Sequence, residues 1–307
     1  MSLSFSTSWN AQRYDNSEDL LFEIGNLGFS ELELSFNLTA SILEGIKDSV
    51  TNKKFTVSSV HNYCPIPETF KRKEALPDCY SISSKDREER SLALKYTKRS
   101  IETASSLNAK AVVLHCGRVE VPSRARELIN LYNAGELNSK YYDELKTKTL
   151  QDRSNSALPF VSNALKSLEE LNKFAKDKGI LLGIENRFYD NEIPSLEEIG
   201  LILERFKGSN IFYWHDTGHA QVMENLKIHK HADYLSQYGF NLLGIHLHNV
   251  IGCLDHQAPI KGQIDFNILK PYLKKDTIKV IEAHYPSSKD EIIESRKFLE
   301  KLFHDTI

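Results

Sequence analysis

Short apolar runs alternate with longer amphipathic stretches along the whole chain, and this alternation constrains the fold more than any other feature. Strands that alternate with helices are typical of βα units, whose strands form a parallel sheet. Eight candidate strands favour a closed (β/α)8 barrel that takes up residues 1–307 as a single domain. The candidate strands are Leu3–Ser8, Glu31–Ser35, Phe55–His61, Ala111–His115, Ile180–Glu185, Ile211–Asp216, Leu242–His248 and Lys279–His284.

An open, doubly wound sheet is the competing architecture. It would favour a glycine-rich phosphate loop after the first strand. The first strand instead runs into Trp9-Asn10-Ala11, which favours the barrel. Helix signals lie between the strands, such as a capping box that begins at Ser195 and a helix-stop residue at Gly179. The expected helices are Ser17–Asn26, Ser84–Leu107, Pro159–Lys178, Ser195–Phe206, Asp265–Leu273 and Ser288–Phe303.

Residues 118–158 separate the fourth strand from the helix that is expected next, which is long for a βα loop. The stretches RARELINLYNAGEL and YYDELKTKTLQDR have helical patterns. The chain is therefore predicted to carry a helical insertion after the fourth strand. Because βα loops lie beside the active sites of such barrels, this insertion could form a lid or a contact between subunits of a homo-oligomer.

The charge balance excludes one large class of partners. The chain has 39 basic and 42 acidic residues and a formal net charge of -3. Proteins that bind nucleic acid through its phosphates usually carry a basic excess, so duplex DNA is not an expected partner. Four cysteines without a CxxC pair, no secretory signal and no membrane-length apolar run predict a cytoplasmic protein.

Residues that can bind a metal stand at or near the ends of six consecutive candidate strands. In a parallel barrel all these ends meet at one face. Three carboxylates crowded with imidazoles would repel each other or lose their charges unless a cation held them. His246 and His248 lie two residues apart and so point to the same side of their strand. The strand-end residues are His61, His115, Glu185, Asp216, His246 with His248, and Glu282; His219 follows Asp216 by three residues.

Each of these residues has a structural interpretation when it is taken alone. A single histidine at a strand end is more often a hydrogen-bonded core residue than a ligand, and Glu185 could be one half of a structural ion pair. The metal hypothesis depends on the coincidence, because six successive strands would have to end in this way by chance.

At this point the sequence resembles the xylose isomerase-like TIM-barrel superfamily, which holds sugar isomerases and epimerases together with apurinic endonucleases of the endonuclease IV type. The resemblance covers nearly the whole chain. It is carried by IENRF, HDTGHA, IHLHN, KGQIDF and VIEAH, which occur in this order. It is greatest to bacterial proteins called sugar phosphate isomerases or epimerases, many of which have no assigned substrate.

The resemblance implies a set of site residues. In the ketose epimerases of the superfamily, one ion is held at the positions that match Glu185, Asp216, His246 and Glu282, and the two glutamates also act as the acid–base pair. In endonuclease IV these positions hold one zinc of a three-zinc cluster. The further ligands of that cluster match His61, His115, His219 and His256. It also needs an aspartate where this chain has Leu254, with Asp255 beside it.

Ligand chemistry favours particular metals and a reaction. Three carboxylates with one imidazole suit Mn²⁺ or Mg²⁺, whereas the extra histidines suit Zn²⁺, and we favour Mn²⁺. The expected reaction is isomerisation or epimerisation of a sugar or sugar phosphate through an enediolate, with Glu185 and Glu282 moving the proton. His61 or His115 could pass protons to substrate oxygens. Arg187 and His248 are candidate substrate-binding residues.

Two other functions remain as alternatives. A multi-zinc phosphodiester hydrolase acting at abasic DNA would use the fuller histidine set, although the acidic charge balance and Leu254 oppose it. A barrel with another activity, such as a dehydratase, or with no turnover at all is the third alternative, because a fold and its ligands do not fix the reaction.

Overall fold

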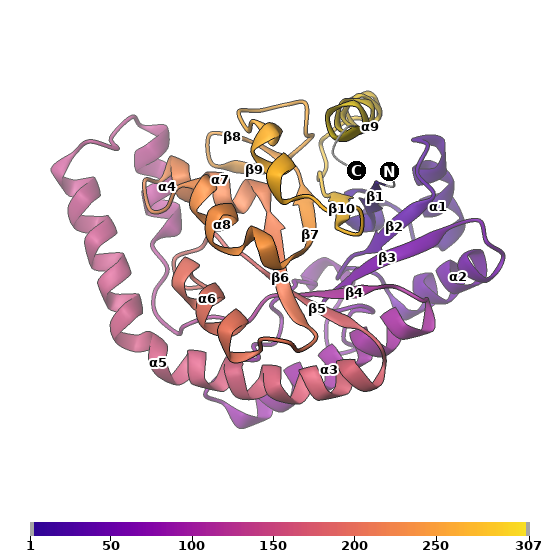
Figure 1. Ribbon diagram of the computed structural model, residues 1–307, viewed down its shortest axis with the longest axis horizontal. Helices are drawn as coiled ribbons and strands as arrows, with labels where there is room; N and C mark the ends of the chain where they lie inside the picture. Colours follow the sequence, from indigo (N-terminus) through magenta and orange to yellow (C-terminus); the bar gives the residue numbers. More distant parts are fainter. Residues whose placement is uncertain (1–2, 305–307) are drawn as a thin grey trace.

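The computed structural model describes residues 3–304, which form a closed barrel of parallel strands surrounded by helices (Figure 1). Neighbouring strands pair in chain order from β1 to β7, and β10 closes the ring between β7 and β1. The TIM-barrel prediction is confirmed, and each candidate strand overlaps one strand of the ring. The barrel strands are β1 (Ser4–Ser6), β2 (Glu31–Leu34), β3 (Thr56–His61), β4 (Ala111–Leu114), β5 (Leu181–Glu185), β6 (Ile211–Asp216), β7 (Leu242–Leu247) and β10 (Ile278–Ile281).

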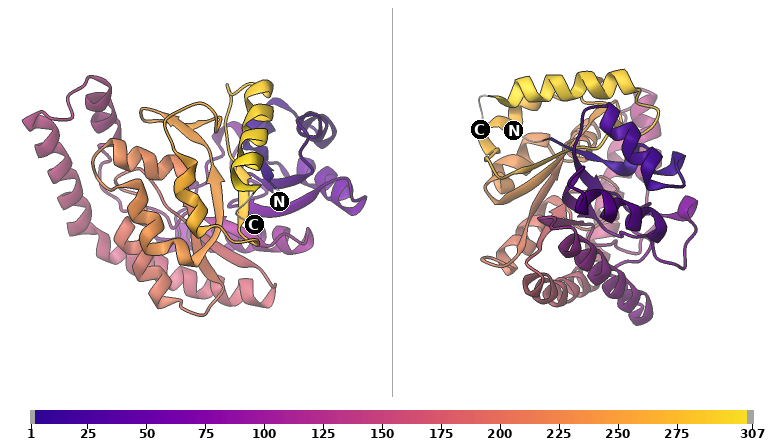
Figure 2. Two further views of the ribbon diagram at one scale, coloured as in Figure 1. Left: turned by 45° about the horizontal axis from the view of Figure 1, so that its top comes forward. Right: turned by 90° about the vertical axis from the view of Figure 1, so that its right-hand side faces the viewer.

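Helices cover the outside of the barrel. Most begin at a residue whose side chain accepts a hydrogen bond from the first turn, as Ser195 does from the backbone N–H of Glu198. In both views of Figure 2 the C-terminal helix α9 lies beside the N-terminal part of the chain, where Arg296 donates to the carbonyl of Leu27. The helices are α1 (Ser17–Asn26), α2 (Ala40–Thr51), α3 (Arg87–Ser106), α4 (Ala125–Asn133), α5 (Lys140–Asp177), α6 (Leu196–Arg205), α7 (Thr217–Asn225), α8 (His231–Tyr238) and α9 (Lys289–Phe303).

Two expected helices differ from the structure. The helix expected at Pro159–Lys178 is the second half of α5, which begins at Lys140 and bends in its middle, where Pro159 lies (Figure 1). A proline inside a helix removes one hydrogen bond, but the first half of α5 is held by tertiary contacts. Arg153 in that half donates to both carboxylate oxygens of Glu198 at 2.7 and 2.6 Å. The segment Phe266–Tyr272 is a 3-10 helix that contains Pro271, and not an α-helix.

The chain also adds a short hairpin after β7. Strands β8 (Asn249–Ile251) and β9 (Leu254–Gln257) pair antiparallel outside the barrel and carry Asp255 and His256 toward its mouth. Among the helices of residues 3–304, none is both long and apolar enough to cross a membrane.

Trp214 fills the centre of the barrel beneath the mouth. Its side chain is fully buried, and the two strands beside it contribute glycines at the closest positions. A Cβ atom at Gly244 would lie 2.2 Å from the indole, and one at Gly183 would lie 2.7 Å from it. The ring of His246 lies directly against the same indole, with ring centroids 5.2 Å apart. Trp214 therefore forms the floor on which the residues of the mouth are arranged.

Gly244→Ala is expected to destabilise the barrel by about 1–3 kcal/mol, because the added methyl group overpacks this floor. Urea unfolding of the variant checks this value. Gly25→Ala is the matched control, because a Cβ there meets its nearest atom at 3.5 Å and alanine is the better helix former. Equal stabilities of Gly244→Ala and wild type would mean that the indole can move aside.

Candidate metal centre

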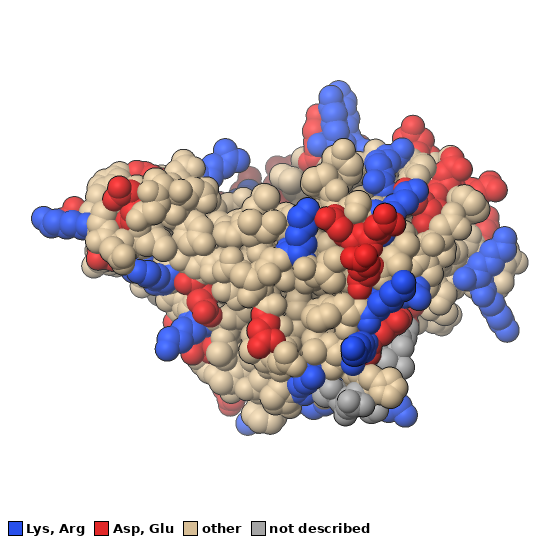
Figure 3. Space-filling model, turned by 90° about the horizontal axis from the view of Figure 1, so that it is seen from above, with Lys and Arg blue, Asp and Glu red and all other residues tan. Residues whose placement is uncertain are grey.

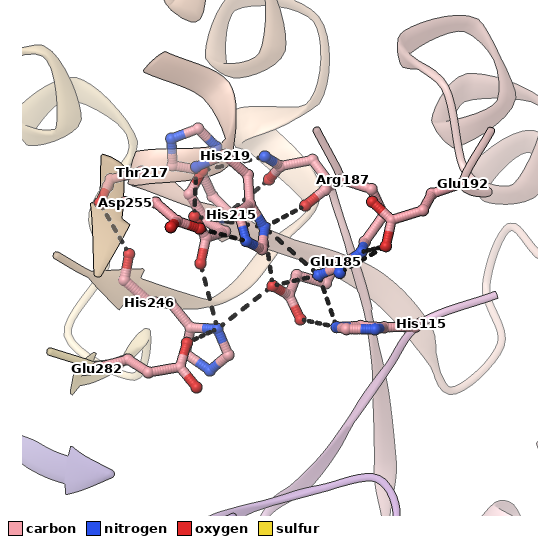
Figure 4. A network of polar contacts seen from close by, with 12 residues as sticks. His115, Glu185, Arg187, Glu192, His215, Thr217, His219, His246, Asp255 and Glu282 are labelled. Atoms are coloured by element: carbon pink, nitrogen blue, oxygen red, sulfur yellow. Dashed lines mark hydrogen bonds and ion pairs between the residues drawn. The ribbon is translucent and has the colours of Figure 1, made fainter. Parts of the chain in front are cut away.

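Four predicted ligands lie together at the carboxyl ends of their strands, and Figure 4 shows three of them, Glu185, His246 and Glu282. Glu185 and Asp216 are the last residues of β5 and β6, His246 is in β7, and Glu282 directly follows β10. All four side chains are buried. The period of two along a strand explains their common direction, because Glu185, His246 and Glu282 alternate with apolar residues that face the helices.

The Nδ1 atom of His246 is the point on which the group converges. It lies 2.9 Å from Glu282 Oε2, 3.6 Å from Glu185 Oε1 and 3.6 Å from Asp216 Oδ2. It makes no hydrogen bond of good geometry with any residue that the structure describes. Ligands held about 2.1 Å from a six-coordinate ion lie about 3 Å apart. These residues therefore fit a divalent ion both in donor chemistry and in spacing.

The pKa shifts favour ionised carboxylates at Glu185 and Asp216 and a protonated imidazole at His246. Burial alone would raise the pKa of Glu185, but the imidazoles of His115, His219 and His246 lower it well below its ordinary value. Burial likewise opposes ionisation of Asp216, and His219 and His248 outweigh it to lower its pKa. Burial would lower the pKa of His246, yet the carboxylates of Glu282 and Glu33 raise it well above its ordinary value. A proton on His246 thus supplies positive charge that a metal ion would replace.

Two further side chains orient these ligands. His246 directs its Nε2 atom at the carboxylate of Glu33 on β2, at 3.0 and 3.2 Å. His248 Nδ1 accepts from the backbone N–H of His256, so its Nε2–H donates to Asp216 at 2.8 Å. Such partners fix the ring orientation and tautomer of ligands. His248 is fully buried with both nitrogens bonded inside the protein, and one of these bonds orients Asp216.

Asn186 holds the backbone around Asp216. Its side-chain oxygen accepts from the backbone N–H of Asp216 at 2.8 Å and from the Tyr213 hydroxyl at 2.9 Å. Its side-chain nitrogen donates to the carbonyl of Asp216 at 3.0 Å. The amide therefore ties the end of β5 to the end of β6, and the two adjacent ligands keep a fixed separation.

His61 and His115 lie beside Glu185 Oε2, whereas His246 faces the other carboxylate oxygen, Oε1. Their Nε2 atoms are 3.3 and 3.0 Å from Glu185 Oε2. Arg187 enters the same cluster, with Nη1 2.7 Å from His115 Nε2 and 3.3 Å from Glu185 Oε1. Behind it, the Nε and Nη2 atoms of Arg187 both donate to Glu192, at 3.2 and 2.7 Å.

His219, Asp255 and His256 form a third group on the side of the hairpin. Asp255 Oδ2 lies 2.9 Å from His256 Nδ1 and 3.8 Å from His219 Nε2. Leu254 points away and is exposed. The His256 ring stacks between His248 and His284, with centroids 4.2 and 3.8 Å away. Asp255 thus comes near His219 and His256, and it takes the side of the hairpin where the resemblance would place an aspartate at position 254.

A pocket of about 270 Å³ opens above these groups. Its volume is slightly below the usual range of ligand sites and suits a small polar molecule. Among the described residues that line it, Arg187 is the only lysine or arginine. The lining residues are Phe36, His61, Pro77, His115, Glu185, Arg187, Phe188, Tyr189, His219, Asp255, His256, Glu282 and His284.

Sequence reasoning did not identify several members of this site. Glu33 had a usable signal, because a glutamate between leucines in ELEL must point into the barrel if the leucines point out. His284, two residues after Glu282, shares its direction. Asp78 had no such signal, because it lies in an irregular loop and contacts His115 Nδ1 at 2.9 Å across 37 residues. Glu192 similarly belongs to a turn after β5.

Comparisons with known proteins agree with this architecture. No curated protein sequence is similar enough to count as a match. Solved structures do match along their full length. A D-tagatose 3-epimerase-like protein has 19% identity and a TM-score of 0.68, covering 100% of this chain and 98% of its own. The 3-keto-D-glucoside 4-epimerase of E. coli has 15% identity and a TM-score of 0.67, covering 98% and 99%. A Thermus thermophilus protein soaked with ZnCl2 has 21% identity and a TM-score of 0.60, covering 99% and 98%.

At these identities the structural matches describe the fold alone. The sequence model of the family described as xylose isomerase-like TIM barrel is more specific, because it matches residues 23–302. This range includes every strand of the barrel except β1 and all the site residues named above. The chain belongs to the xylose isomerase-like TIM-barrel family.

Proposed function

We propose that this protein is a metal-dependent sugar isomerase or epimerase, with Glu185, Asp216, His246 and Glu282 as the ligands of one divalent ion. The convergence of three carboxylates on His246 Nδ1 carries this proposal. The names of the structural matches, which include sugar epimerases, support the same class of reaction. Three carboxylates and one imidazole favour Mn²⁺, with Zn²⁺ or Mg²⁺ as alternatives.

A bound ion would act as a Lewis acid on adjacent carbonyl and hydroxyl oxygens of the substrate. The protein would then move one proton. Glu185 and Glu282 both line the pocket and approach His246 from different strands, β5 and the end of β10. One carboxylate would take a proton from a carbon next to the carbonyl, leaving an enediolate, and the other would return a proton. His61 and His115 also line the pocket and could exchange protons with substrate oxygens.

The charges of the pocket favour a neutral sugar over a sugar phosphate. Three carboxylates line it, and its arginine is already engaged by Glu192, Glu185 and His115. A phosphate would therefore meet repulsion without a free cation to balance it. This inference concerns the substrate and leaves the proton-transfer mechanism unchanged.

The test is solvent deuterium incorporation into a panel of ketoses and their phosphates, followed by mass spectrometry, with the protein loaded with Mn²⁺. At least one free ketose is expected to exchange, and its phosphate is expected to exchange more slowly. Chelated protein is the control. Faster exchange of phosphates would overturn the neutral-substrate assignment, and exchange that persists without metal would overturn the metal dependence.

A zinc-dependent phosphodiester hydrolase is the second candidate, because two further groups could hold ions, His61 with His115 and Glu185, and Asp216 with His219, His248 and His256. The balance of 39 basic against 42 acidic residues opposes it. On the face seen in Figure 3, Lys and Arg are interspersed with Asp and Glu and form no basic field. Incision of an abasic duplex by zinc-loaded protein, absent after chelation, would favour this second function. We expect no incision.

A further inference from the structure

We infer that the guanidinium of Arg187 takes the place of a second metal ion, so that no ion binds between His61, His115 and Glu185. This inference rests on the proposed function for the first ion, which Glu185 would share. It disagrees with the multi-zinc arrangement that the resemblance to endonuclease IV implies. It assigns Arg187 the role of setting the number of ions in the site.

The side chains of His61, His115 and Glu185 could form a second metal site. Their candidate ligand atoms all lie within 4.8 Å of one another, and all three side chains are buried. Both Nε2 atoms already face the same oxygen, Glu185 Oε2, at 3.3 and 3.0 Å. Two imidazoles and a carboxylate are an ordinary ligand set for zinc.

Arg187 blocks the atom that such an ion would need. The Nη1 atom of Arg187 lies 2.7 Å from His115 Nε2, so an ion cannot reach that nitrogen while the guanidinium is in place. On the other side of the ring, His115 Nδ1 faces Asp78 at 2.9 Å, which holds the imidazole in this orientation. The same Nη1 atom is 3.3 Å from Glu185 Oε1. Figure 4 shows the guanidinium between Glu185, His115 and Glu192, with dashed lines to all three.

The position of Arg187 is fixed from behind. Its Nε and Nη2 atoms donate to one oxygen of Glu192, and the other oxygen of Glu192 accepts from the backbone N–H of Tyr189 at 3.0 Å. The residue is 9% exposed. The guanidinium thus delivers one permanent positive charge beside two imidazoles and Glu185. A divalent ion between His61, His115 and Glu185 would lie against that charge without Asp216 and Glu282 to balance it, and it would compete with the guanidinium for His115.

The experiment counts the ions that depend on His115. Wild type, Arg187→Met and Arg187→Lys are saturated with Zn²⁺ and with Mn²⁺ in separate samples, freed of loose metal by gel filtration, and measured by inductively coupled plasma mass spectrometry. Each is compared with the same protein carrying His115→Ala. Circular dichroism and elution volume verify that every variant is folded. Methionine keeps the length of the stem without the charge, whereas lysine keeps the charge.

We expect His115→Ala to remove no ion from wild type or from Arg187→Lys, and to remove one ion per chain from zinc-saturated Arg187→Met. Loss of an ion from wild type on His115→Ala would overturn the inference, as would an Arg187→Met variant that gains none. The first ion is identified separately by Asp216→Ala. If Asp216→Ala leaves the wild-type count unchanged, the proposed metal centre is wrong, while the count that depends on His115 still decides the role of Arg187.

Discussion

Glu282→Gln is expected to lower proton exchange on a substrate carbon by about 10²–10⁴-fold, the usual contribution of a general acid–base group. The amide keeps the shape of the side chain and one oxygen that can face the ion. It removes the basic carboxylate, which lies 2.9 Å from His246 Nδ1 in a residue that is 4% exposed. Exchange rates on the best ketose of the panel and metal content are measured on the same samples.

Glu204→Gln is the matched control for this variant. Glu204 is an exposed glutamate of α6, 3.9 Å from Lys207, and its replacement should leave exchange at the wild-type rate. If Glu282→Gln retains full exchange at full metal occupancy, Glu282 is a ligand alone and the mechanism with two glutamates is wrong for this protein.

Asp216→Ala is expected to weaken metal binding by more than about 100-fold. Replacing a residue that only hydrogen-bonds to a metal ligand usually weakens binding by roughly 10–100-fold, and Asp216 is proposed as a ligand itself. The variant removes an oxygen that faces His246 at 3.6 Å and leaves the buried Nε2–H of His248 without its acceptor. It also removes the cap that receives the backbone N–H of His219 at the start of α7. Competition with a chelator of known affinity measures the loss.

The metal affinity of Glu33→Gln provides the comparison, because Glu33 orients the proposed ligand His246 and is not proposed as a ligand itself. Glu33 touches His246 Nε2 and not the converging Nδ1 atom, so its replacement should cost about 10–100-fold in affinity. An Asp216→Ala variant that binds metal as tightly as Glu33→Gln, or more tightly, would move the ion away from Asp216.

The sequence predicts the barrel and the direction of its strand ends because both depend on short-range periodicity. Glu185, Asp216 and His246 could be assigned to one face for this reason alone. The supports of these residues could not be found in the same way. The contact of Asp78 with His115 depends on the path of an irregular loop, which no local pattern encodes.

Arg187 illustrates a second limit of prediction from sequence, the direction of a long side chain. The sequence places an arginine just beyond Glu185 and suggests a contact with substrate, but the direction of its long side chain is set by Glu192 in the following turn.

The helix around Pro159 differs from its prediction for a similar reason. Local chemistry favours a helix start at proline, whereas the contact of Arg153 with Glu198, 45 residues away, extends the helix in the N-terminal direction.

The bond between His246 and Glu33 joins residues that are 213 positions apart in the chain. Glu282, which approaches the other nitrogen of the same ring, follows the last strand to join the barrel. Contacts over such distances form only after the chain has lost most of its loop-closure entropy, so these side chains cannot gather in a partly folded chain. An ion bound by these residues would connect β5, β6 and β7 with the end of β10, and interactions made late in folding act mainly on the unfolding rate. If the proposed ion binds, its removal should therefore shorten the lifetime of the native barrel more than it slows folding.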